Sequence, residues 1–186
     1  MRTSLRLTDT IWTDDESHPP AMKELRFELD RSFRLDLSGI PRCGWAPTQT
    51  FPPFDWDACE KAEVAKGPVR FEVARPEEEP VKINAPAITY NGRRGAMLIH
   101  AELGDPINEE LVIPVRLSRA NAGLYGGRLT AAIPKVADGN GSLIYIGLRF
   151  RRGLFSVACP KGRLQSRVAH TFLNGYLDTT TFRSAC

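Results

Sequence analysis

The sequence predicts an all-β protein, an antiparallel β-sandwich of about ten to twelve short strands with one short helix in the 55–62 region. Two observations predict this class. Apolar and polar residues alternate with a period of two along most of the chain, as in strands with one buried and one solvated face. Turn-forming dipeptides separate these segments at short intervals. We expect one domain over residues 1–186, with residues 1–20 as a loosely attached N-terminal strand and loop.

The strands are expected where this alternation is clearest. In residues 23–30, Leu25, Phe27 and Leu29 alternate with charged residues. The dipeptide Asn174-Gly175 lies between two such segments and predicts a tight hairpin over residues 164–183. The other strands are expected at residues 31–37, 69–74, 81–83, 87–90, 96–103, 111–117, 128–133, 142–151 and 154–159.

One short helix is expected after a proline-rich stretch. Asp55 is placed to cap its N-terminus, and the acidic residues that follow suit the helix dipole. In this interpretation the helical turn presents Cys59 to Cys43.

The chain has four cysteines, Cys43, Cys59, Cys159 and Cys186, and none forms a C-x-x-C pair. Three pairings are therefore open. The local pairing, Cys43 with Cys59 and Cys159 with Cys186, closes the shortest loops, each worth roughly 3 kcal/mol in the chain-entropy model. An even number of cysteines, one of them terminal, favours an oxidising compartment.

The N-terminus lacks the apolar segment of a signal peptide, and no apolar run approaches the length that spans a bilayer. Residues 5–12 look like a strand instead. We expect an extracellular or cell-envelope protein without a transmembrane segment, and a chain whose start is truncated after a missing leader.

The charge is uneven although the net charge is only +3. Residues 1–80 hold 11 Lys and Arg against 16 Asp and Glu, whereas residues 81–186 hold 14 against 6. The basic residues are scattered, and the densest groups are Arg93-Arg94 and the segment 149–152. We therefore expect no nucleic-acid partner.

No residue pattern predicts a catalytic, metal or cofactor site. The three histidines, His18, His100 and His170, share no ligand-like spacing, and no G-x-S-x-G elbow marks a nucleophilic serine. His170 is expected to be a hydrogen-bonded histidine of the core. Aromatic residues gather around the predicted Cys43–Cys59 loop and are either candidate ligand contacts or a small core under that loop: Trp45, Phe51, Phe54 and Trp56.

Short segments spread over residues 20–186 resemble the secreted, all-β hypothetical proteins of Actinobacteria of the Solirubrobacter/Thermoleophilia type. They include the segments 29–34, 39–43, 58–62, 84–86, 90–92, 99–101, 125–126, 133–135, 158–165 and 184–186. The resemblance implies an exported protein with both local disulfides. It implies no activity.

Together these observations favour a non-enzymatic, secreted or envelope-associated binding or structural module whose partner is a cell-envelope glycan or protein. One alternative is an extracellular hydrolase acting on an envelope polysaccharide or ester. Another is a carbohydrate-binding module that uses the loop aromatics.

Overall fold

The computed structural model describes residues 2–15, 17–44, 55–120, 123–159 and 162–185. Its elements follow one another along the chain as β1 (Arg2–Thr3), β2 (Arg6–Thr10), β3 (Met22–Asp30), β4 (Phe33–Leu35), η1 (Asp57–Ala62), β5 (Glu63–Arg75), β6 (Glu78–Asn91), β7 (Ala96–Leu103), β8 (Glu109–Arg119), β9 (Tyr125–Ala132), η2 (Ala137–Gly139), β10 (Gly141–Phe150), β11 (Phe155–Val157), β12 (Arg163–Phe172) and β13 (Leu177–Ala185). The predicted all-β class is confirmed.

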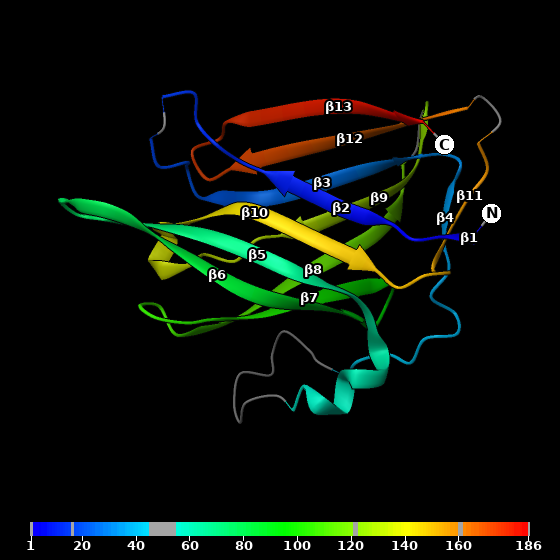
Figure 1. The fold of residues 1–186 in the computed structure, drawn as a ribbon, viewed down its shortest axis with the longest axis horizontal. Coiled ribbons are helices and arrows are strands. Elements are labelled where there is room, and N and C mark those ends of the chain that lie inside the picture. Colours follow the sequence, from blue (N-terminus) through cyan, green and yellow to red (C-terminus); the bar gives the residue numbers. More distant parts are fainter. Residues whose placement is uncertain (1, 16, 45–54, 121–122, 160–161, 186) are drawn as a thin grey trace.

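The strands form two antiparallel sheets (Figure 1). The large sheet has the order β13-β12-β3-β9-β8-β7-β6-β5-β10-β2, and the small sheet has the order β1-β11-β4. The large sheet curls strongly, so that β2, at one of its edges, lies near β12 on the other side. Side chains from its concave face and from the small sheet form one continuous apolar core.

The short helix predicted in the 55–62 region is a 3₁₀-helix of six residues, Asp57–Ala62, rather than an α-helix. Asp55 does accept a hydrogen bond at its N-terminus, from the Asp57 N–H at 3.0 Å. A helical segment of six residues followed directly by strand β5 is too short to propagate an α-helix. Within the described ranges no helix is long and apolar enough to cross a membrane.

Strands β5 and β6 form a hairpin that is longer than the sequence predicted. They span 13 and 14 residues and run through Pro68, Pro80 and Pro86, where separate shorter strands were expected. Pro68 lies directly opposite Pro86 in the pairing. On its other side β5 approaches β10 closely at Gly67, where an added Cβ would lie 1.8 Å from the Gly147 carbonyl oxygen.

The curled sheet is tied together by a buried histidine where β2 faces β12. His170 Nε2 lies 2.7 Å from Asp9 Oδ2, and its Nδ1 lies 3.4 Å from Asp178 Oδ2. Burial alone would lower the pKa of His170, but the hydrogen bonds and charges of Asp9 and Asp178 outweigh burial and raise it. His170 is therefore the hydrogen-bonded core histidine that the sequence predicted.

Gly67→Ala should destabilise the fold, because the Cβ would meet backbone atoms of β10 rather than a movable side chain. We expect a loss of about 1–3 kcal/mol in the free energy of unfolding, measured by urea denaturation. Gly104→Ala is the matched control, since a Cβ at Gly104 has no heavy atom within 4 Å. Equal effects of the two substitutions would contradict the close approach of β5 and β10.

The His170 contact should make stability depend on pH. Because the pKa of His170 is raised in the folded state, the contact contributes fully to the free energy of unfolding below about pH 6.5. This contribution is lost as the pH rises through the folded-state pKa. His170→Gln should remove this component, which has a slope of at most about 1.4 kcal/mol per pH unit. Urea titrations between pH 5 and 8 measure it.

His100 provides a control, because its effect on the pH dependence of stability has the opposite sign. Burial lowers the pKa of His100, and the charges of Glu110 and Glu102 offset this effect only in part. The contribution of His100 to the free energy of unfolding is therefore lost as the pH falls below about 6.5. His100→Gln should therefore remove a slope opposite to the one that His170→Gln removes. The same pH profile for both variants would contradict the assigned partners.

Candidate functional site

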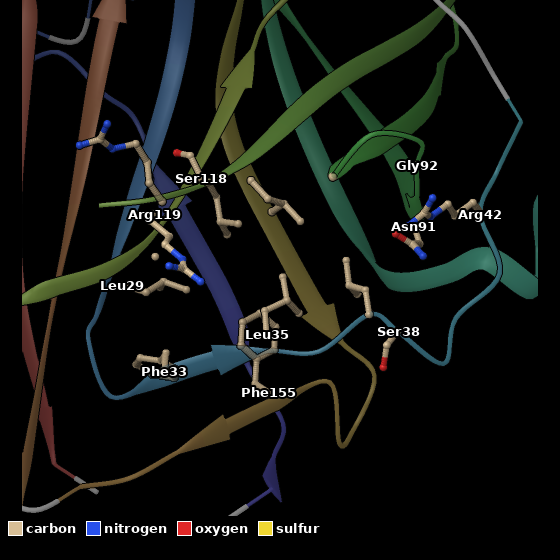
Figure 2. A pocket seen from close by; sticks show the side chains of 16 residues that line it. Leu29, Phe33, Leu35, Ser38, Arg42, Asn91, Gly92, Ser118, Arg119 and Phe155 are labelled. Atoms are coloured by element: carbon tan, nitrogen blue, oxygen red, sulfur yellow. The ribbon is translucent and has the colours of Figure 1, made fainter. Parts of the chain in front are cut away.

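A cleft of about 520 Å³ opens at one end of the large sheet, and we call it the end cleft. It lies where β4 and the loop after it cross the ends of β3, β8 and β9 and the turn between β6 and β7 (Figure 2). Its lining residues are Leu29, Phe33, Leu35, Leu37, Ser38, Arg42, Asn91, Gly92, Gly95, Leu117, Ser118, Arg119, Gly127, Arg128, Leu129 and Phe155.

The deep part of the end cleft is apolar and continuous with the core. Leu29, Leu129 and Phe155 belong to the buried core and also line the cleft. The Phe155 ring packs edge-on against Phe33, at 6.4 Å between centroids, and against Phe150, at 5.1 Å. These contacts make one wall of the cleft rigid and hydrophobic.

The rim of the end cleft is basic. Arg42 and Arg119 are exposed and lie on opposite sides of the opening (Figure 2). Within the part of the chain that the structure describes, neither guanidinium forms an ion pair with a carboxylate. Two arginines without counter-charges beside an apolar floor produce a positive potential at the mouth of the cleft.

Arg42 is positioned by contacts of its neighbours. The side-chain amide of Asn91 donates hydrogen bonds to the carbonyl oxygens of Ile40, at 2.9 Å, and Pro41, at 3.1 Å. The Cys43 N–H donates to the Asn91 carbonyl at 2.7 Å. The backbone on both sides of Arg42 is therefore fixed to the end of β6.

The predicted disulfide between Cys43 and Cys59 is confirmed, with both residues buried. It joins the loop that carries Arg42 to η1. Cys159 is also disulfide-bonded. Cys186, its predicted partner, lies outside the described residues.

Arg128, the third arginine of the end cleft, is held by a buried carboxylate. Glu28 is only 3% exposed and accepts hydrogen bonds from Arg128 at 2.7 and 3.0 Å and from Arg167 at 2.6 Å. Burial would raise the pKa of Glu28, but the two guanidinium groups lower it below its ordinary value. Arg167 also lies over the Tyr125 ring, at 5.0 Å from its centroid.

Of the four predicted ligand-contact aromatics, only Trp56 lies in the described residues; Trp45, Phe51 and Phe54 lie outside them. The Trp56 ring stacks on Tyr90 and His100, with centroids 5.4 and 4.1 Å apart, and its Nε1 donates to the Glu110 carboxylate. Trp56 does not line the end cleft. For Trp56, this packing agrees with the second interpretation given above, a small core under the loop.

A second polar cluster was missed by sequence reasoning because its members lie far apart along the chain. His18 Nδ1 is 3.0 Å from Glu72 Oε1, and His18 Nε2 is 3.3 Å from Ser142 Oγ. Hydroxyl, imidazole and carboxylate follow one another as in a hydrolytic triad. However, Ser142 is 1% exposed, and its hydroxyl donates to the Pro19 carbonyl oxygen. The cluster therefore fastens the segment before β3 onto β5 and β10.

No signal in the sequence indicated the end cleft, because its residues come from widely separated stretches of the chain, between positions 29 and 155. In the described part of the chain, no group of three or more His, Cys, Asp or Glu residues is arranged to hold a metal ion. The end cleft offers apolar contacts and guanidinium donors to a ligand.

Comparison of this chain with protein-family models, with curated proteins and with solved structures found no match.

The buried serine cluster should be unreactive. We expect a fluorophosphonate probe to leave Ser142 unmodified in the folded protein, because the hydroxyl is enclosed and donates to a carbonyl. Intact-mass spectrometry measures this, with Ser142→Ala as the reference. A single adduct that is absent from Ser142→Ala would contradict the structural role.

Proposed function

We propose that this protein is a non-enzymatic binding module and that its end cleft holds a small amphipathic anion, such as a long-chain carboxylate. The observation that carries the proposal is the combination of an apolar floor with Arg42 and Arg119 on the rim. A guanidinium group pairs with a carboxylate through two parallel hydrogen bonds. Each methylene group buried on the floor would add about 0.8 kcal/mol.

The size of the end cleft supports this ligand class. Its volume of about 520 Å³ falls within the range of small-molecule sites. The floor is lined by leucine and phenylalanine side chains, which favour an alkyl chain over a polar ligand. The hydrogen bonds from Asn91 and the Cys43–Cys59 disulfide fix the loop of Arg42 before any ligand binds, which reduces the entropy lost on binding.

We also propose that the protein works outside the cytoplasm, at the cell surface or in the cell envelope. Three cysteines among the described residues are disulfide-bonded, and none of the cysteines there is free. Such bonds persist in oxidising compartments. The resemblance to secreted actinobacterial proteins stays a prediction that agrees with this location.

Isothermal titration with dodecanoate, below its micelle concentration, tests the proposed ligand class. We expect Arg42→Gln/Arg119→Gln to bind dodecanoate at least about tenfold more weakly, since two charge-assisted contacts are lost. Arg183→Gln, on the edge strand β13, is the control and should bind as the unaltered protein does.

Two further ligands separate the contributions of charge and of the alkyl chain. Dodecanol keeps the chain without the charge, and acetate keeps the charge without the chain. Both should bind more weakly than dodecanoate. Equal affinity for dodecanol, or an equal loss in Arg183→Gln, would refute the proposed binding mode.

A further inference from the structure

A second depression lies on the outer, convex side of the large sheet, and we call it the outer groove. It has a volume of about 1010 Å³ and crosses β3, β9, β8 and β7. Its lining residues are Glu24, Arg26, Arg93, Arg94, Gly95, Ala96, Leu98, Pro114, Arg116, Ser118, Arg128, Thr130 and Ala132. Five of them are arginines and only one is acidic.

Three of these arginines carry uncompensated charge. Arg26 is paired with Glu24 at 2.7 Å, and Arg128 is paired with Glu28. Arg93, Arg94 and Arg116 are exposed, and they have no ion pair with any carboxylate in the described ranges. Among the described residues, the lining of the groove therefore carries more positive than negative charge, which gives the groove a positive potential.

The register of the strands places Arg116 and Arg26 in one row of side chains on this face of the sheet. Ala96 pairs with Arg116, Arg116 with Thr130, and Thr130 with Arg26, so that one row of side chains crosses four strands. Arg116 and Arg26 are two strands apart, which corresponds to about 10 Å between their backbones. In this row the small side chain of Thr130 lies between Arg116 and Arg26, and Ala96 lies on the far side of Arg116.

The turn between β6 and β7 extends this row of charges. Arg94 has a φ of 55°, in the left-handed region that suits glycine better than arginine. The turn is closed by hydrogen bonds from the Gly92 N–H to the Ala96 carbonyl, at 2.9 Å, and from the Ala96 N–H to the Arg93 carbonyl, at 3.2 Å. Arg93 and Arg94 are thus presented from a tight turn at the end of the groove.

We propose that the outer groove binds an acidic polysaccharide through its carboxylate or sulfate groups. Several separated arginines match a chain that carries repeated charges better than they match a single anion. All the basic lining residues are arginines, which form paired hydrogen bonds with such oxyanions. Among the residues that the structure describes, no aromatic side chain lines the groove, and aromatic side chains are the stacking surface with which single-stranded nucleic acid is held. This proposal does not depend on a ligand in the end cleft.

Fluorescence anisotropy with a labelled heparin oligosaccharide and a labelled oligogalacturonate tests the proposal. Arg93→Gln/Arg94→Gln should bind the better of these probes at least fivefold more weakly and with a less steep salt dependence. Arg149→Gln/Arg152→Gln is the matched control, because it removes the same charge from residues that do not line the groove. The control should change the affinity less than twofold. Adding Arg116→Gln to the first variant should weaken binding further.

Three results would overturn the proposal. The first is no binding of either glycan at low ionic strength. The second is an equal loss in both double variants, which would indicate attraction by net charge alone. The third is equal or tighter binding of an oligothymidylate with the same number of charges. Thermal denaturation of each variant checks that the fold is intact, since all the substituted side chains are exposed.

Discussion

Strand β3 pairs with β9 on one side and with β12 on the other, so that an N-terminal strand lies between two strands of the C-terminal third of the chain. Its concave side supplies Leu25, Phe27 and Leu29 to the core, and Leu29 continues into the end cleft. Its convex side supplies Glu24 and Arg26 to the outer groove. The core, the end cleft and the groove all depend on this one insertion.

Glu28, also on β3, neutralises Arg128, which lines both the end cleft and the outer groove. Its carboxylate holds Arg128 and Arg167, which come from positions 100 and 139 residues further along the chain. A buried charge of this kind is costly unless it is fully paired, and here two guanidinium groups pair it. Because Glu28 compensates Arg128, the positive potential of the end cleft comes from Arg42 and Arg119, and that of the outer groove comes from Arg93, Arg94 and Arg116. The two proposed ligands are accordingly both anionic.

The sequence was sufficient for the local features of this fold. Alternation located strands such as β7 and β8, and Asn174-Gly175 located the final hairpin, because these depend on neighbouring residues. The continuous strands β5 and β6 were not foreseen, because proline usually interrupts strands and here tertiary pairing overrides it. The end cleft was not foreseen either. Arg42 and Arg119 line the same cleft because the loop after β4 crosses the end of β8, and this tertiary arrangement is not encoded in a local pattern.

The place of β3 also has a consequence for the order in which the protein assembles. Its partner β9 begins at Tyr125, roughly 95 residues after β3 ends, and β12 follows later still. At about 5–20 residues per second, the ribosome needs roughly 5–20 s to make that stretch, so both edges of β3 stay unpaired meanwhile. An unpaired apolar strand invites aggregation. The charged residues Glu24, Arg26 and Glu28 interrupt the apolar residues of β3, and they would protect the nascent chain before they serve the finished protein.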